Sequence, residues 1–478
     1  MNELNVYTGN DSFAPYDFEI QSSVLGVFNS TVYGLLLNST DDQEPSPGLI
    51  SGWESDFQKK YILTLSKAKF HNGREITARD LEFSIIRGFV SSSLNYNRIH
   101  FSDINGITDL KIGMKYKSGM VSGLKVLNEK QLEIELSNVN PIFLSNFTMP
   151  FVPLVPEEEL KDDYFTWKRW PIGAGAYKVD ADYQDHRLRL VAVKPVAERP
   201  DIIVIDNARK MDKYDLLFDE VAASDKEKDF EKVLSKYPVS LVSITFYRDN
   251  PLNQDLNFRK AVYHAIDRDA LSLNMEQFKP AYEMMVRPHD DLKPKNPFNM
   301  TLAKSYLSKV PHHLLKDGVK IGIYATDDHW TPVMQERISR MTNQFKEIGL
   351  EVTFEANPEK FPIPEVVKKF TLRMFSKVVD LADPAVSYGA MSSRSPYRNE
   401  NPINDDSYDL AYEKTLKATD LKTRLSAIEE LSALIEERAI VSPLMQKYAY
   451  YRMNPAKIKT IGNQPKPLFL DLSKIELK

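Results

Sequence analysis

The residues best suited to do chemistry in this chain are its histidines, serines and carboxylates, and they show none of the common catalytic spacings. A zinc protease presents two histidines four residues apart on a helix, with a glutamate between them. None of the eight histidines forms such a pair, and the adjacent His312 and His313 share neither a helix face nor a strand face. Packed or solvated histidines therefore explain the pattern better than a metal site does.

Other chemical signatures are also missing from the sequence. There is no G-x-S-x-G turn for a serine nucleophile and no G-x-x-x-x-G-K-[ST] loop for phosphates. Gly173-Ala174-Gly175 lacks the third glycine and the preceding strand of a dinucleotide-binding loop. The absence of cysteine excludes disulfides, thiolate zinc ligands and cysteine nucleophiles. We expect no catalytic residue, no metal ligand and no cofactor, and hence a binding protein and not an enzyme.

Composition narrows the classes of protein further. With 478 residues and 42% hydrophobic residues, the chain is too long for one core and is expected to form two or three lobes. Its 62 basic and 67 acidic side chains give a net charge of −5, which lacks the concentrated basic field that nucleic-acid binding needs. No run approaches the ~18 apolar residues of a membrane span. The N-terminus has no charged and apolar signal regions, so either the protein is cytosolic or a signal segment was removed and Met1 added for expression.

Alternating strand and helix patterns predict an α/β fold. The clearest unit is a strand that begins at Val319, a helix that starts after Thr331 and ends at Gly349, and a second strand from Leu350. Threonine is a typical N-cap, Pro332 suits the first helical turn, and glycine favours the left-handed backbone of a helix end. We expect two parallel strands joined by a right-handed crossover.

Further helices are predicted from apolar stripes and caps. Residues 420–438 and 256–266 each place apolar side chains on one face, and Asp420 or Thr419 suits the start of the first. Asp267 is expected to cap the next helix. Thr77-Ala78-Arg79-Asp80 has the spacing of a capping box, with aspartate in the usual glutamate position.

Four segments follow one another in an order and at distances typical of one protein family. The most specific is residues 68–84, where Phe70-His71-Asn72-Gly73 precedes the Thr77–Asp80 capping box. The others are residues 32–36 with 47–49 and 53–54, residues 171–177, and residues 258–262 leading into 265–268. Together they resemble the bacterial solute-binding proteins of family five, which serve peptide and nickel uptake. Residues 171–177 depart from the family, which usually has threonine and proline where alanine stands at 174 and 176.

Most of these motif residues are interpreted as structural framework and not as ligand contacts. Phe70 and the turn at Gly73 are expected to fix a strand-to-helix corner. Asp80 adds negative charge where a helix begins, which is favourable by about 0.3–1 kcal/mol. Arg259 and Asp267 are expected to be framework polar residues. The motifs therefore identify the family without marking the binding site.

The resemblance implies an α/β, two-lobed periplasmic-binding-protein type II fold with an extra subdomain and a ligand cleft between the lobes. Carried over, lobe I comprises residues 1–36, 155–246 and 453–478, the extra subdomain residues 37–154, and lobe II residues 247–452. Closure by hinge motion buries the solute, and the closed form docks on an ABC permease in the inner membrane. A monomer is expected, either periplasmic or extracellular and membrane-anchored, with its signal segment absent from this sequence. The family argument thus favours export over a cytosolic location.

In peptide-binding members of the family, an aspartate in an acid–x–x–acid–proline segment pairs with the ligand ammonium. Asp380 occupies that position, followed by Asp383 and Pro384. A carboxylate in a closed, water-poor cleft attracts an ammonium far more strongly than one at the surface does. A turn or cap role for Asp380 is the alternative interpretation, and Asp383 suits a structural role better.

The resemblance also implies other ligand contacts, but at some of these positions the sequence differs from the family's usual residue. Dipeptide binders carry an arginine for the ligand carboxylate where counting back from Gly349 gives Asp328, which would repel that group. Lys377 stands where an aromatic residue is usual and could supply a positive charge. Trp330 is expected either to form an aromatic wall or to pack in the core. Residues 18–21, with Glu19 and Gln21, match the region whose backbone pairs with peptide in oligopeptide binders.

The leading hypothesis is capture of oligopeptides or another amine-bearing solute. The same fold also binds metal chelates, haem, opines and oligosaccharides, so a non-peptide ligand is the first alternative. An enzyme or a cytosolic regulator on this fold is the second. A regulator of that type carries an N-terminal helix-turn-helix domain, for which the first family motif, near residue 32, leaves no room.

Overall fold

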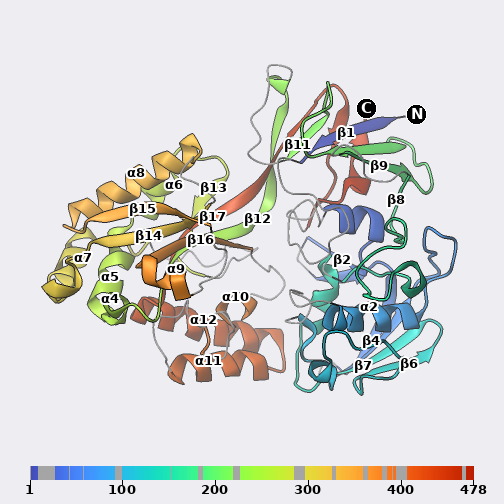
Figure 1. Cartoon of the computed structure of the whole chain (residues 1–478), viewed down its shortest axis with the longest axis horizontal. Helices are drawn as coiled ribbons and strands as arrows, with labels where there is room; N and C mark the ends of the chain where they lie inside the picture. The colour runs from blue at the N-terminus through green and yellow to red at the C-terminus, as the bar shows by residue number, and fades with distance from the viewer. Residues whose placement is uncertain are drawn as a thin grey trace. The chain divides into compact units, whose positions relative to one another are not determined.

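The computed structural model divides the chain into two compact units, which are described separately (Figure 1). Unit 1 comprises Met1–Tyr237 and Ala449–Lys478, and unit 2 comprises Pro238–Tyr448. The structure describes residues 2–8, 27–41, 44–56, 59–91, 100–150, 152–180, 187–218, 227–284, 296–325, 330–358, 364–378, 385–389, 391–393, 406–465 and 470–478. The mixed α/β class is confirmed, while the finer division into lobe I, extra subdomain and lobe II stays a prediction.

The main sheet of unit 1 is built on three parallel strands. β1 (Glu3–Tyr7) lies between β10 (Ile202–Asp206) and β11 (Leu216–Phe218) and runs parallel to both. Leu4 and Val6 are fully buried, as are most residues of β10, because both faces of a parallel sheet are covered. β9 (Arg187–Ala192) and β8 (Tyr177–Val179) extend the sheet antiparallel beyond β10. β17 (Val441–Met453) pairs antiparallel with β11 on the other side.

A second sheet of unit 1 carries the most specific motif. β4 (Ile50–Ser55), β5 (Lys60–Leu65), β7 (Gln131–Glu135) and β6 (Leu124–Asn128) form an antiparallel sheet in that order. Its strands alternate buried and exposed residues, as an antiparallel sheet with one solvated face should. Helix α2 (Ala78–Val90) packs against β6 and β7.

Unit 2 contains the strand–helix–strand arrangement expected from residues 319–354. β14 (Val319–Tyr324) pairs in parallel with β15 (Val352–Asn357), and α8 (Pro332–Glu347) connects them. The Thr331 hydroxyl accepts a hydrogen bond from the Met334 N–H at 3.3 Å, and Gly349 has a φ of +86°. The predicted cap, proline and left-handed glycine are therefore confirmed.

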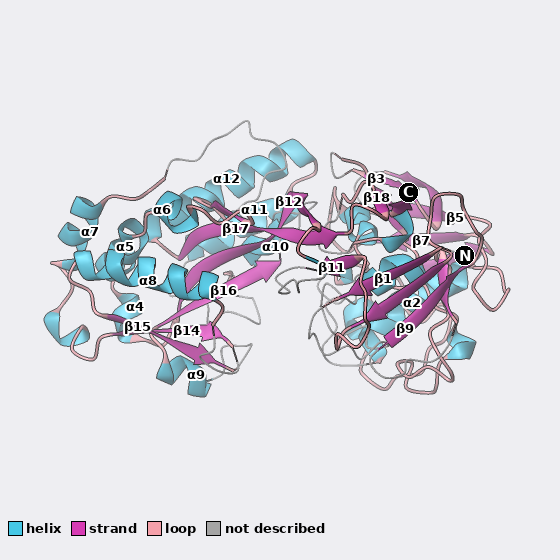
Figure 2. Cartoon of the chain, turned by 90° about the horizontal axis from the view of Figure 1, so that it is seen from above, coloured by secondary structure: helices cyan, strands magenta, loops and turns pink. Residues whose placement is uncertain are grey.

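The sheet of unit 2 continues on the other side of β14. β16 (Leu372–Val378) is parallel to β14, and β12 (Glu231–Phe246) is antiparallel to β16, with β17 next in order. β13 (Phe278–Pro280) pairs with β17. α8 packs against β15 and against the neighbouring helices α5 (Leu256–Ala265) and α6 (Arg268–Ser272) (Figure 2). β12 and β17 each begin in one unit and end in the other.

The predicted helices and caps of unit 2 are also confirmed. α12 (Leu421–Arg438) begins after Asp420, whose carboxylate accepts from the Thr423 N–H at 2.9 Å. Asp267 caps α6 in the same way. Phe258 and Val262 of α5 are fully buried in one core together with residues of β12, β14 and β16.

The remaining elements are short, apart from α11, which packs against α12. The helices are α4 (Pro251–Gln254), α7 (Met300–Leu307), α9 (Pro364–Lys369), α10 (Ala385–Gly389) and α11 (Asp406–Lys417). The helical turns are η1 (Asn29–Tyr33), η2 (Ile107–Asp109), η3 (Phe143–Thr148), η4 (Glu157–Glu159), η6 (His312–Leu314) and η9 (Leu472–Lys474). The strand pairs are β2 (Leu37–Ser39) with β3 (Pro45–Pro47) and β18 (Ile458–Thr460) with β19 (Glu476–Leu477). None of the helices in the described part of the chain has both the length and the apolar character of a membrane span.

Gly173 and Gly175, in the motif of residues 171–177, cross the end of η1 at very close range. The Gly175 N–H donates to the Val32 carbonyl at 2.9 Å. A Cβ at Gly173 would lie 2.1 Å from that same carbonyl oxygen, and a Cβ at Gly175 would lie 2.5 Å from the Thr31 oxygen. Because the atoms in the way are backbone, they have little freedom to move aside. Glycine is therefore required at both positions, because the two backbone segments lie too close together for a side chain.

We expect Gly173→Ala to lower the free energy of unfolding by about 2 kcal/mol or more, since the added methyl group must push two backbone segments apart. Gly52→Ala is the matched control, because a Cβ there meets nothing within 4 Å. Urea unfolding of both variants measures the difference. Equal stabilities would contradict the close-approach argument.

Candidate functional site

The parallel strands of unit 2 end at one edge of its sheet. The last residues of β14, β15 and β16 are Tyr324, Asn357 and Val378, and we call this the unit 2 strand-end edge. In open α/β sheets, ligands bind outside the carboxyl ends of the parallel strands. The segments that carry Trp330, Lys377 and Asp380 lie at or directly after these strand ends.

Lys377 is the penultimate residue of β16 and is half-buried. It pairs with Leu241 of β12, and alternation along the strand puts it on the same face as Phe375 and Arg373. The Arg373 side chain is almost fully buried, and its guanidinium carbon lies 4.5 Å from the centre of the Phe375 ring. One face of β16 therefore carries two cations, a buried Arg373 at the start of the strand and Lys377 next to its end. Arg373 was missed from sequence, because an arginine within a strand pattern normally indicates a solvated position.

Trp330 precedes the N-cap of α8 and packs, partly buried, against the core of unit 2. Its carbonyl accepts a hydrogen bond from the Gln335 side-chain amide at 3.0 Å. The indole Nε1 is buried and has no hydrogen-bond partner among the described residues. The core-packing alternative is thus confirmed for part of the ring, and a ligand-contacting role for Trp330 stays a prediction.

The other predicted contacts lie outside the described residues. These are Asp380, Glu19 and Gln21, together with Asp328 and Asp383. Their expected roles remain predictions from sequence.

Unit 1 has a strand-end edge of its own, formed by Tyr7, Asp206 and Phe218 at the ends of the parallel strands β1, β10 and β11. Asp206 is completely buried. Its carboxylate accepts hydrogen bonds of 2.6–3.1 Å from the backbone N–H groups of Ala208, Lys210 and Met211 and from the Tyr214 hydroxyl. Burial, together with the bond to Asp206, raises the pKa of Tyr214. Asp206 thereby fixes the loop that leaves β10.

Arg209 lies within that loop and has a left-handed backbone, with a φ of +54°. This conformation costs a non-glycine residue about 1–2 kcal/mol. The N–H groups on both sides of Arg209 are bound to Asp206, so the surrounding bonds offset the strain. The sequence gives no signal for Arg209, because the strain depends on the fold of residues 206–214.

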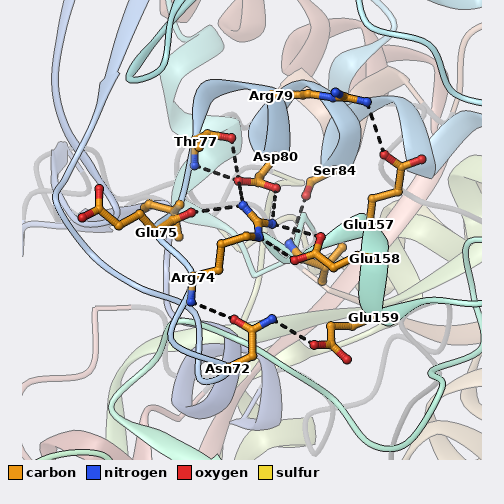
Figure 3. Close-up of polar contacts among 12 residues, drawn as sticks. Asn72, Arg74, Glu75, Thr77, Arg79, Asp80, Ser84, Glu157, Glu158 and Glu159 are labelled. Carbon is orange, nitrogen blue, oxygen red and sulfur yellow. Dashed lines mark hydrogen bonds and ion pairs between the residues drawn. The ribbon is translucent and has the colours of Figure 1, made fainter.

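A surface pocket of about 560 Å³ in unit 1 is lined in part by residues of the most specific motif. Figure 3 shows the polar contacts of these residues. Arg74 donates two hydrogen bonds to Asp80, at 2.7 and 3.0 Å, and also pairs with Glu158. Asp80 accepts further bonds from the backbone and hydroxyl of Thr77, so the predicted capping box is confirmed. At the rim, Arg79 lies 3.8 Å from Glu157, and burial raises the pKa of that glutamate.

Two arginines that line this pocket are thus paired with acidic side chains, Arg74 with Asp80 and Glu158, and Arg79 with Glu157. Asp80 is almost fully buried and is bonded to Arg74 and Thr77. We therefore do not expect it to contact a solute. The arrangement supports the structural interpretation of the motif: Arg74 ties the start of α2 to the segment that contains Glu158.

His71 joins the motif of residues 68–84 to the motif of residues 171–177. Its Nδ1 accepts a hydrogen bond from the Gly173 N–H at 3.3 Å, and its Nε2 lies 3.0 Å from the Gly175 carbonyl. Both bonds require a neutral ring with its proton on Nε2. Burial lowers the pKa of His71 to about 4, with the Gly175 bond opposing and nearby Lys178 adding to the change.

Two buried arginines of unit 2 serve the framework in the same way. Arg259 donates to the carbonyls of Asn253, Gln254 and Arg438, and Arg268 donates to those of Tyr263, Ile266 and Pro443. The framework role expected for Arg259 is confirmed. No group of three metal-ligating side chains occurs among the residues that the structure describes.

Comparison with known proteins identifies the family. A family model for bacterial extracellular solute-binding proteins, family 5 Middle, matches residues 44–399. This chain belongs to family 5. The resemblance to the solute-binding proteins of family five, drawn from the four motifs, is therefore confirmed. The family is extracytoplasmic and is not typically enzymatic.

Curated relatives match parts of the chain. The periplasmic oligopeptide-binding protein OppA of Salmonella typhimurium is 29% identical over 153 residues, which cover 30% of this chain and 27% of OppA. A Brucella ovis protein described as an ABC transporter peptide-binding protein is 26% identical over 262 residues, or 50% of this chain and 46% of that protein. The matched regions thus span less than half of these relatives' own length.

Solved structures match the whole chain. NikA from Brucella suis, in complex with Fe(III)-EDTA, has a TM-score of 0.80 at 17% identity, with all of both chains covered. A periplasmic oligopeptide-binding protein from Borrelia burgdorferi has a TM-score of 0.79 at 19% identity, again with full coverage. At such identities the likeness shows the fold, which is that of the two-lobed binding proteins of family 5.

We expect the stability of unit 1 to fall as the pH drops from about 6.5 towards 4. The unfolded chain binds a proton at His71 near the ordinary pKa of 6.5, whereas the folded protein binds it only near 4. Stability from this group is therefore fully present above pH 6.5 and is lost as the pH falls, by about 3 kcal/mol at most. Urea unfolding at pH 7 and pH 5 measures the loss.

The His71→Gln variant separates this effect from that of His264, whose pKa burial also lowers. The variant should lose less stability than the wild type between pH 7 and pH 5. His312→Gln, at an exposed turn, should behave as the wild type does. An unchanged pH dependence in His71→Gln would show that His71 is not the titrating group.

Asp80→Ala should lower the free energy of unfolding by about 2–4 kcal/mol, because it removes a capping box and leaves Arg74 without its buried partner. Glu158→Ala is the control, and it should cost less than about 1 kcal/mol because that side chain is 48% exposed. Solute affinity should be unchanged in folded Asp80→Ala protein. A large loss of affinity would place the motif in the binding site.

Proposed function

We propose that this protein captures oligopeptides, or a peptide-like solute with a free amine, and delivers them to an ABC permease. Closure of its two units around the solute is the proposed mechanism, and the closed form is what the permease accepts. The Asp380 carboxylate binds the ligand ammonium. Backbone groups near Glu19 and Gln21 pair with the peptide as an added strand would.

The observation that carries this proposal is the position of Asp380 in the chain. It follows Val378, the last residue of β16, by two residues. In sequence, Asp380 therefore comes directly after a strand that ends at the unit 2 strand-end edge. That edge is where α/β sheets bind their ligands, and an aspartate there supplies the negative charge that an ammonium needs.

The relatives support a peptide ligand. The Salmonella OppA and the Brucella ovis protein are both described as peptide-binding. Lys377, at the same strand end as Asp380, adds a cation that a zwitterionic ligand can use. It acts as a point charge, without the planar fork of an arginine.

A non-peptide ligand is the second candidate. NikA binds Fe(III)-EDTA, and another structure of the same fold, AgaA from A. tumefaciens, binds agropinic acid. Such ligands are rich in carboxylates. Lys377, next to the end of β16, is a cation that favours this candidate.

We expect Asp380→Ala to weaken the binding of trialanine at least tenfold, since a charge-assisted bond to the ammonium is worth about 1.5–3 kcal/mol. Isothermal titration calorimetry measures the change. Asp383→Ala is the matched control and should bind as the wild type does. N-acetyl-trialanine should bind the wild type and Asp380→Ala equally weakly, because it has no ammonium. An unchanged affinity of Asp380→Ala for trialanine would refute the ammonium role.

A further inference from the structure

The strand-end edge of unit 1 presents an arginine in a fixed position. Arg209 projects from the loop that Asp206 holds, because the N–H groups of Ala208 and Lys210 on either side of it donate to the Asp206 carboxylate at 2.8 and 2.7 Å. The loop has little freedom, since the carboxylate also accepts from the Tyr214 hydroxyl. The backbone therefore directs the side chain before any solute arrives.

The guanidinium of Arg209 is also held at its far end. Its Nη2 donates to the Glu227 carboxylate at 2.6 Å, and its central carbon lies 5.3 Å from the centre of the Tyr7 ring. Glu227 is buried, with 4% of its side chain exposed, whereas 29% of the Arg209 side chain is exposed. The pair therefore has a buried acidic end and a basic end that solvent reaches.

A second donor lies at the same edge. Thr8 follows the last residue of β1, and its N–H donates to the Asp206 carbonyl at 3.1 Å. Its hydroxyl is buried and has no hydrogen-bond partner among the described residues. A buried hydroxyl that bonds to no described residue is a candidate donor to a further group.

We propose that Arg209 binds a carboxylate of the solute at the unit 1 strand-end edge, with the Thr8 hydroxyl as a second donor. A guanidinium matches the planar carboxylate with two parallel N–H bonds, and a fixed guanidinium loses little freedom on binding. Position 328, where the family's dipeptide binders carry such an arginine, holds an aspartate in this chain. Arg209 supplies the missing fork from a different element.

Glu227 sets the strength of this site. Its charge opposes that of an arriving carboxylate, and it competes for the same guanidinium. Replacing it by glutamine keeps the size of the side chain and removes the competing charge. We therefore expect two opposite effects on the affinity for a carboxylate ligand. Replacing Arg209 should lower the affinity, and replacing Glu227 should raise it.

This inference rests on the proposed function and is tested with trialanine and its C-terminal amide, titrated by calorimetry. The wild type should bind the free acid at least tenfold more tightly than the amide. Arg209→Ala should lose that preference and keep its affinity for the amide. Glu227→Gln should bind the free acid severalfold more tightly and the amide as before.

The control is Arg189→Ala, which removes another ion-paired arginine of unit 1, from the middle of β9 and away from the strand ends. It should keep the wild-type preference. Equal binding of acid and amide by the wild type, with Asp380 still required, would overturn the role of Arg209 and leave the peptide function standing. If the wild type binds neither form, the peptide function fails and this inference fails with it.

Discussion

The arrangement of both candidate edges depends on one constraint, the parallel pairing of buried strands. Parallel neighbours must all end on the same side of a sheet, so residues from distant parts of the chain are brought to one edge. In unit 1 this places Tyr7 beside Asp206, with Tyr7 and Asp206 directly paired in register. In unit 2 it places the end of β14 beside β16, with Ile323 opposite Met374. Each edge gathers polar groups where backbone hydrogen bonding ceases, and there side chains can meet a solute.

The motifs that identify the family perform a different task. Arg74 and Asp80 hold the start of α2, and His71 bonds to Gly173 and Gly175, the two glycines that cross the end of η1. His71 is constrained because its partners are backbone atoms, whereas Arg74 is held by the side chains of Asp80 and Glu158. The strand-end residues, which we propose meet the solute, lie outside these motifs. The fold is therefore easier to infer from the sequence than the ligand is.

Sequence reasoning predicted local features well and long-range ones poorly. The cap at Thr331, the left-handed Gly349, the capping box at Asp80 and the helix from Leu421 follow from interactions within a few residues, and all are confirmed. Arg209 could not be found in this way. Its conformation depends on Asp206, and its position beside Tyr7 depends on a strand some 200 residues earlier in the chain. The predicted ligand contacts Asp380, Glu19 and Gln21 came from family resemblance, and they lie outside the described residues.

The discontinuity of unit 1 has a consequence for biosynthesis. Leu217 of β11 pairs with Arg452 of β17, and the Leu472 N–H bonds to the Thr31 hydroxyl across 441 positions of sequence. Unit 1 therefore cannot complete its core until the last residues of the chain have been made. Unit 2 is one contiguous stretch of chain, so it can fold before the C-terminal part of unit 1 has been made. Contacts of such long range form slowly, and the N-terminal half stays open for most of synthesis.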